Sequence, residues 1–316
     1  MSHLRLVALV TLSCLLAACS KEPQAPADTP DASTPASTTQ ATNASSATPS
    51  EPGKPKKPEV PDNPERVQRV EELVDLLNNR AQRRTAREEL QAMGKNCVPY
   101  LLQHSEDSRM TTRWEVANIT GLLKDERATD VLVDYVVADE NPHVRWRSQW
   151  AVAQLRNKSE ALQQLRAHLG GNDEWRAWNA AVGLATLNDK SGADMILEKG
   201  LKITTGADAD WRRWEAVKSV ERLDDPRSAG ALAAMIDDPN ERVRREVALT
   251  LGKVKGAEVK GALLQMLGDD KEQVRWRAVK SLSRHKDADV VSALRELQKT
   301  ETAEIVIEHL EKALGS

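Results

Sequence analysis

The sequence predicts an all-α fold, built as an array of stacked helix pairs that begins near residue 64. Three observations support this prediction. Amphipathic segments with helical spacing recur about every 31 residues, no segment shows the period-2 alternation of a strand, and Gly, Pro, Asp and Asn breakers separate the segments. One helix pair cannot bury its own apolar face, so neighbouring pairs must stack to form a continuous core.

Residues 1–18 have the composition of a secretory signal peptide. Arg5 precedes the apolar run "LVALVTLSCLLAA", which is too short to span a membrane as a helix. The run ends in "LAAC", residues 16–19, which resembles the lipobox of bacterial lipoproteins. The resemblance implies cleavage before Cys19, a diacylglyceryl thioether on its sulfur and acylation of the new N-terminus, with palmitate as an expected chain. An ordinary secretory signal that happens to contain a Cys is the alternative.

The lipoprotein resemblance also implies a location. Ser20, rather than Asp, follows the cysteine. In enteric bacteria this favours the outer membrane, so we expect a lipid-anchored protein of the cell envelope that faces the periplasm. Several acyl chains, at about 0.8 kcal/mol per buried methylene, give a lasting anchor.

Residues 19–63 contain the lipidated cysteine and a predicted disordered linker rich in Pro, Ala, Ser and Thr. Ten of the fourteen prolines lie between Pro23 and Pro64, and the segment has no aromatic residue. Such a segment cannot bury enough apolar surface to offset its ordering entropy. As a coil it would span roughly 35–40 Å, and fully extended about 135 Å. We therefore interpret it as a tether that lets a folded body stand off from a membrane.

Residues 64–316 contain a twelve-residue helix motif that recurs six times. Small or apolar residues recur at its fifth, eighth, ninth and, except for His285, twelfth places. A second amphipathic segment, such as "ATDVLVDYVV", separates successive copies, one further pair precedes them, and "AEIVIEHLEKAL" follows. The sequence thus predicts about seven helix pairs and a C-terminal capping helix. The motif copies begin at Thr112, Val144, Arg176, Arg212, Val243 and Val274.

The copy "VRREVALTLGKV" closely matches the pattern VRxxAAxALGxL of HEAT repeats. The array resembles the HEAT family over nearly all of residues 64–316, in particular the HEAT-like variant found in phycobilin lyases. The resemblance implies a right-handed α-solenoid in which the first helix of each pair lies on the convex side and the second lines the concave side.

A column of Asp and Arg residues accompanies the motif. Arg occupies the second place in most copies, and Asp stands five residues before most motif starts; the copy with Ala177 at the second place also has Gly171 instead of Asp. By resemblance to HEAT families, these residues form ion pairs between adjacent repeats. Exposed pairs are worth under about 1 kcal/mol each, so we expect them to fix register; an anion-binding stripe is the alternative. The predicted ladder is Asp107, Arg113, Asp139, Arg145, Asp238, Arg244, Asp269 and Arg275.

The third place of the motif is almost always Trp. It lies about 175° around the helix from the buried stripe, on the side that the family places on the concave surface. Five indoles would present up to about 1,000 Å², whereas monomers rarely expose a patch above about 300–600 Å². We therefore predict a partner-binding groove, with mutual packing of Trp and Arg as the alternative. Its residues are Trp114, Trp146, Trp150, Trp178, Trp214, Arg245 and Trp276.

Catalysis has little support in the sequence. The His residues of the mature chain are scattered without metal-ligand spacing, and no phosphate loop, nucleophile elbow or HExxH motif is present. Cys97, in "GKNCVPYLL", is expected to be a small buried hydrophobe. We predict that the protein is not an enzyme and needs no metal or cofactor.

The helical region is close to neutral, with 40 Lys and Arg against 42 Asp and Glu, which argues against nucleic acid as a partner. The sequence therefore favours a lipid-anchored envelope scaffold that grips a partner protein in a groove lined with Trp and Arg, and contacts the membrane only through its lipid. Carbohydrate or peptidoglycan binding by the Trp ladder is the alternative. A tetrapyrrole lyase or chaperone, by analogy with bilin lyases, fits an exported lipoprotein less well.

Overall fold

The computed structural model describes residues 55–206 and 208–315, and these residues form helices joined by short turns, without a strand. The predicted signal peptide, Cys19 and the linker up to residue 54 lie outside the described residues. Within the described part, no helix is both long enough and apolar enough to cross a membrane.

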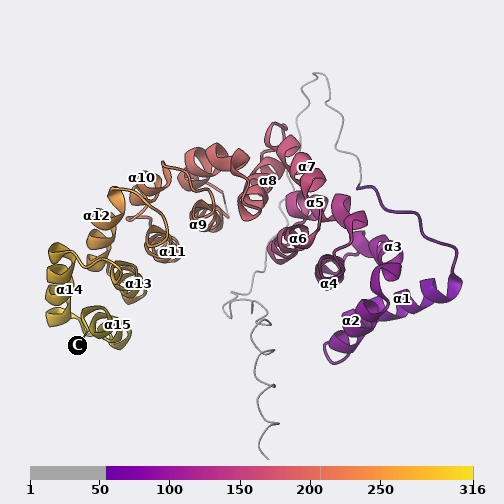
Figure 1. The fold of residues 1–316 in the computed structure, drawn as a ribbon, viewed down its shortest axis with the longest axis horizontal. Coiled ribbons are helices and arrows are strands. Elements are labelled where there is room, and N and C mark those ends of the chain that lie inside the picture. The colour runs from indigo at the N-terminus through magenta and orange to yellow at the C-terminus, as the bar shows by residue number, and fades with distance from the viewer. Residues whose placement is uncertain (1–54, 207, 316) are drawn as a thin grey trace, which may run out of the picture. The chain divides into compact units, whose positions relative to one another are not determined.

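Most of the helices form two rows (Figure 1). The inner row consists of the motif helices and the final helix: α4 (Met110–Leu123), α6 (Pro142–Gln154), α9 (Ala209–Val220), α11 (Glu241–Leu251), α13 (Glu272–Leu282) and α15 (Glu304–Leu314). The outer row consists of α3 (Val98–Leu101), α5 (Thr129–Ala138), α7 (Ser159–Leu169), α10 (Ser228–Ala233), α12 (Glu258–Gln265) and α14 (Ala288–Thr300).

The remaining helices are α1 (Pro64–Leu77) and α2 (Arg83–Ala92) at the start and α8 (Glu174–Thr186) in the middle. Short 3-10 or π segments join the longer helices: η1 (Gly94–Cys97), η2 (Leu102–Glu106), η3 (Glu126–Ala128), η4 (Lys190–Gly192), η5 (Met195–Lys199), η6 (Gly200–Lys202) and η7 (Met266–Gly268). The prediction of an all-α solenoid closed by a C-terminal helix is confirmed.

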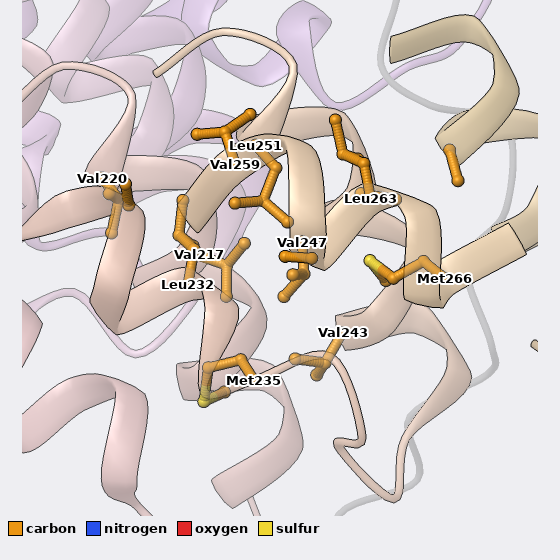
Figure 2. Packing of buried hydrophobic residues seen from close by; sticks show 14 of the residues in the cluster. Val217, Val220, Leu232, Met235, Val243, Val247, Leu251, Val259, Leu263 and Met266 are labelled. Carbon is orange, nitrogen blue, oxygen red and sulfur yellow. The ribbon is translucent and has the colours of Figure 1, made fainter. Parts of the chain in front are cut away.

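Helix α11 illustrates how the motif produces this arrangement. Its N-cap, Asn240, accepts a hydrogen bond from the backbone nitrogen of Arg242 at 2.9 Å, which satisfies one free N–H group of the first turn. Val243, Val247 and Leu251 recur at helical spacing and are fully buried. Figure 2 shows them among side chains from the neighbouring helices. Each such burial contributes roughly 1.5–3 kcal/mol, so the stripe drives the stacking.

The folded unit begins earlier than the predicted boundary at residue 64. The Tyr100 hydroxyl donates to the backbone oxygen of Pro61 at 3.1 Å, and the Gln103 amide donates to that of Pro58 at 3.5 Å. Lys57 Nζ also lies 2.9 Å from Glu106 Oε1. These contacts hold the end of the predicted linker along α3 and η2.

Helix α8 departs from the regular stacking. The helices α4 and α6 stack on one another, as do α9, α11, α13 and α15, whereas α8 packs mainly against α5 and α7. It lies between the two rows in Figure 1. Every residue from Ala177 to Ala185 is buried, so α8 has no exposed face over these turns. The motif copy in α8 is followed by the longest spacing in the array, 36 residues from Arg176 to Arg212.

Candidate functional site on the inner helix row

The inner face is defined here by the third-place residues of the inner motif helices together with Trp150. Each of its members is partly exposed. It therefore includes six of the seven predicted groove residues: Trp114 on α4, Trp146 and Trp150 on α6, Trp214 on α9, Arg245 on α11 and Trp276 on α13.

Trp178 does not belong to the inner face, and the prediction that it faces away from the core is wrong. Its side chain is only 3 % exposed and belongs to the core cluster that contains Ile196 and Val217. The backbone of Gly200 lies against the ring, because a Cβ on this glycine would stand 2.3 Å from Trp178 Cζ3. Since α8 is set back from the inner row, the place that faces outward on other motif helices faces a neighbouring segment here.

At the N-terminal end of the inner face, arginines form cation–π contacts with the indole rings. The Arg147 guanidinium carbon lies 4.3 Å from the centroid of the Trp114 ring and 4.9 Å from that of Trp150. Arg87 lies 5.7 Å from the Trp114 centroid. Cation–π contacts of this kind contribute about 0.5–2 kcal/mol each, so they favour the observed orientations of these rings.

A buried ion pair lies beneath this cluster. Glu115 is fully buried, and its two oxygens accept hydrogen bonds from Arg87 Nε at 2.8 Å and Arg87 Nη2 at 2.5 Å. Asn118 Nδ2 donates to the same carboxylate at 3.2 Å, and Asn118 Oδ1 accepts from Arg147 Nη1 at 3.4 Å. The network ties α2, α4 and α6 together and fixes the cations that hold the indoles.

Trp214 anchors a second cluster on α9. Its ring centroid lies 4.7 Å from the Arg242 guanidinium, 4.9 Å from Lys218 Nζ and 4.8 Å from the Trp211 ring. Its Nε1 donates to Glu246 Oε2 at 3.2 Å.

Trp276 is held in the same way at the C-terminal end. Its ring lies 4.7 Å from the Arg277 guanidinium and 4.9 Å from the His309 ring, and its Nε1 donates to Gln273 at 2.8 Å.

The residues at the fourth place of the motif were missed in the sequence analysis. Trp178 Nε1 donates to Glu215 and Trp214 Nε1 donates to Glu246, so in both cases the acid belongs to the next motif helix. Burial raises the pKa of Glu215. A signal was available, because five of the six fourth places carry a charge: Glu115, Arg147, Glu215, Glu246 and Arg277, with Asn179 as the exception.

The Asp and Arg residues form a ladder of bidentate pairs. In each pair, Arg Nε and Nη2 grip the carboxylate of the next repeat. The distances are 2.7 and 3.1 Å for Arg113 with Asp139, 2.6 and 3.1 Å for Arg213 with Asp238, 2.7 and 3.0 Å for Arg244 with Asp269, and 2.7 and 2.8 Å for Arg275 with Glu301.

This geometry explains the gaps in the sequence pattern. Each Arg pairs with the acid of the following repeat. The acid that would pair with position 177 would therefore stand at position 207, and the sequence has Ala at both positions, so both partners of this pair are replaced. Glu301 supplies the last acid and was not foreseen. Asp107 pairs with Arg109 beside it, and these hydrogen bonds lower the pKa of Asp107 to about 2. Arg145 has no acidic ladder partner among the described residues.

Other chemistry is sparse in the described part of the chain. It contains no group of three or more His, Cys, Asp or Glu residues that could hold a metal ion. Cys97 is fully buried, its Sγ lies 3.3 Å from the Leu90 oxygen, and burial raises its pKa to about 11. A thiol with that pKa remains protonated at neutral pH and is a poor nucleophile.

Similar folds occur in solved structures. A protein of Escherichia coli, YibA, is 19 % identical, with 73 % of this chain and 85 % of that chain covered and a TM-score of 0.50. Human deoxyhypusine hydroxylase is 19 % identical, with 79 % of this chain and 96 % of that chain covered and a TM-score of 0.34. A chain in the complex of CpcE and CpcF of phycocyanin lyase from Nostoc is 16 % identical, with 69 % of this chain and 93 % of that chain covered and a TM-score of 0.40. At these identities, the YibA match shows the fold alone.

Sequence comparison gives the family. Among curated proteins, no match to the sequence was found. The family model for HEAT repeats matches residues 98–185, 197–270 and 235–315, which together make up well over half of the chain. These matches include the motif helices of both indole clusters and the irregular helix α8. The chain therefore belongs to the HEAT-repeat family.

Proposed function

We propose that the protein is a lipid-anchored scaffold of the bacterial cell envelope that binds a partner protein through the inner face. One observation carries this proposal. Partly exposed indoles lie on four of the inner helices, α4, α6, α9 and α13, and cations and acids contact their rings. Rings that are already ordered lose little conformational entropy on binding, which favours affinity.

The charges beside the indoles indicate the chemistry of the partner segment. Glu115 is paired with Arg87, and Glu246 accepts from Trp214, so these acids are engaged within the protein. The cations that stack on the indoles exceed the acids beside them. They are Arg87, Arg147, Lys218, Arg242, Arg277 and Lys280. An extended or helical segment with apolar and acidic side chains would complement this surface.

The positions of these cations favour a protein over a glycan. A sugar ring stacks on an open aromatic face. On Trp114 and Trp214, cations already lie 4.3 and 4.7 Å from the ring centroids. Trp146 has the more open ring, with Lys218 Nζ at 5.9 Å. The partly exposed rings and the flanking arginines suit peptide side chains, which gain from both apolar contact and charge.

The anchor and the location rest on the "LAAC" sequence. Cys19→Ala should abolish palmitate labelling and release the protein from the outer-membrane fraction, because the thioether can no longer form. A variant that still labels and remains membrane-bound would refute the lipid anchor. That the protein is not an enzyme remains a prediction.

Partner binding can be tested in the intact envelope. A photo-crosslinking residue in place of Arg245, on the inner face, should capture a specific envelope protein. The same residue in place of Lys299, exposed on the outer helix α14, is the matched control. Equal capture from both positions, or none from Arg245, would refute the inner face as the binding surface.

Substitution of the indoles tests their contribution to affinity. Trp146→Ala and Trp214→Ala should each weaken partner retention by about 2 kcal/mol, roughly thirtyfold, as expected of aromatic hot spots. Retention should be measured per folded molecule, with the thermal midpoint recorded alongside. Unchanged retention in the double variant would leave these indoles with a packing role only.

A further inference from the structure

The ladder arginines share one binding geometry. In the pairs of Arg113, Arg244 and Arg275, Nε and Nη2 grip a carboxylate, while Nη1 donates to the backbone oxygen six residues earlier, at 2.9 Å in each case. Arg213 donates to the Asp238 carboxylate from the same two atoms, Nε and Nη2, which are called the fork of the arginine below. The guanidinium is therefore oriented by its own backbone and presents its Nε and Nη2 edge to the next repeat.

Arg145 makes only half of these contacts. Its Nη1 donates to the backbone oxygen of Asp139 at 2.9 Å and to that of Glu140 at 3.2 Å, so it has the common orientation. The ladder acid of the next repeat is replaced by Gly171. No carboxylate of the described residues lies within 4.0 Å of the Arg145 guanidinium, although the residue is only 5 % exposed.

Among the described residues Arg145 donates from Nη1 alone, so its Nε and Nη2 have no acceptor there. The face of the guanidinium stacks on Trp175, with 4.8 Å between its central carbon and the ring centroid, and Arg212 lies 4.7 Å from the same ring. Among the nearby acids, Asp208 is paired with Arg212 at 2.9 Å, and Glu215 accepts from the Trp178 indole. Stacking covers the flat face of a guanidinium and leaves its hydrogen-bonding edge free.

Arg145 is buried without a carboxylate of the described residues in hydrogen-bond contact, and the attraction of nearby carboxylates, that of Glu215 first, does not offset its desolvation. Burial accordingly lowers the pKa of Arg145, whereas the paired Arg113, Arg213 and Arg244 all have raised pKa values. The ladder contains five arginines. Four of them bind a carboxylate of the next repeat, and Arg145 binds none that belongs to the described residues.

We propose that Arg145, flanked by Trp175 and Arg212, is a binding site for a carboxylate of a partner protein, an Asp or Glu side chain that takes the place of the missing ladder acid. The incoming group would accept from Nε and Nη2, as Asp139, Asp238, Asp269 and Glu301 do in the other pairs. The planar fork matches a carboxylate in bidentate fashion. This site lies on the ladder, and its assignment does not depend on binding at the inner face.

The chain offers a direct way to fill the site from within. A Cβ on Gly171 would meet only the backbone oxygen of His168, at 3.4 Å, and the residue does not have a positive φ. Gly171→Asp can therefore be accommodated and would restore the acid of the regular repeats. Gly171→Asn has the same shape without the charge and is the matched control.

The experiment titrates the full-length protein with acetate at constant ionic strength and follows the Nε–H resonance of Arg145 by NMR, assigned by its loss in Arg145→Lys. We expect a saturable shift in the wild type and in Gly171→Asn. In Gly171→Asp we expect no shift with acetate, because the fork is already occupied, and a higher thermal midpoint than in Gly171→Asn.

Phosphate at the same ionic strength provides the second arm of the titration. A saturable shift with phosphate and none with acetate would overturn the assignment to a carboxylate. An unresponsive wild-type resonance, or equal acetate shifts in wild type and folded Gly171→Asp, would overturn the site itself. If Gly171→Asp fails to fold, the acetate response of wild type and Gly171→Asn still decides the outcome.

Discussion

Helices α8 and α11 contain copies of the same motif and have different surroundings. In α11 the buried residues form a stripe, and Leu249 at the seventh place is partly exposed. In α8 the corresponding Val182 is buried, as is every residue from Ala177 to Ala185. The motif fixes how side chains are arranged around their own helix, whereas the neighbouring helices decide which of those positions meet solvent.

The indoles of Trp178 and Trp214 show the same difference. Both rings occupy the third place, and both donate from Nε1 to a Glu at the fourth place of the next motif helix, at 3.2 Å. Trp178 is nevertheless buried in the core, while Trp214 remains partly exposed on the inner face. The same hydrogen bond from a Trp to a Glu therefore occurs in the core in one repeat and at a surface in another.

The largest effect should come from this pair of indoles. Trp178→Ala should lower the free energy of unfolding by about 3–5 kcal/mol, because it empties a site in the core. Trp214→Ala should cost less than half as much, since part of its ring is already in water. Chemical denaturation of both variants measures the difference. Equal losses would contradict the distinction between the two helices.

The seventh and ninth places test the same comparison with aliphatic residues. Leu251→Ala, at the buried ninth place of α11, should cost about 2–5 kcal/mol, whereas Leu249→Ala should cost under about 1 kcal/mol. Val182→Ala, at the seventh place of α8, should cost about 1.5–3 kcal/mol. If Val182 tolerates Ala as well as Leu249 does, α8 has an exposed face after all.

The end of the ladder should be sensitive to acid. The hydrogen bonds from Arg275 lower the pKa of Glu301 to about 2, below its unfolded value of about 4.3. A lowered pKa stabilises the fold above the unfolded value, and this stabilisation is lost as the pH falls from about 4.5 to about 2.

Glu301→Gln should therefore destabilise the protein by about 1–3 kcal/mol at pH 7, and the difference from wild type should shrink towards pH 2. Unfolding free energies measured across this range provide the check. A difference that does not change with pH would mean that the charge of Glu301 does not contribute to stability.

The smallest effect concerns the junction across α8. Lys218 Nζ, on α9, lies 4.9 Å from the Trp214 centroid and 5.9 Å from that of Trp146 on α6. Lys218→Met keeps much of the side-chain volume and should cost under about 1 kcal/mol. A double-mutant cycle with Trp146→Leu should give a small favourable coupling between the two residues. Zero coupling would argue that α6 and α9 do not interact where α8 is set back.

The sequence by itself determined the repeat, the phase of the buried stripe and the chemical types in both columns. These features follow from the 3.6-residue period, which is local to each helix. Leu251 and Val247 could be assigned to the core for this reason. Arg113 and Asp139 could be assigned to a ladder between repeats by resemblance to the family, and the structure shows that each Arg pairs with the acid of the following repeat.

Only the tertiary structure decided the rest. The local period does not reveal that α8 packs on α5 and α7, so the burial of Trp178 could not be read from its place in the motif. The docking of residues 55–63 depends on Tyr100 and Gln103, which are distant in sequence. That Arg145 lacks a carboxylate follows from the finding that each ladder Arg pairs with the acid of the following repeat, where Arg145 meets Gly171. Each of these features depends on which segments become neighbours, and helical periodicity contains no information about that.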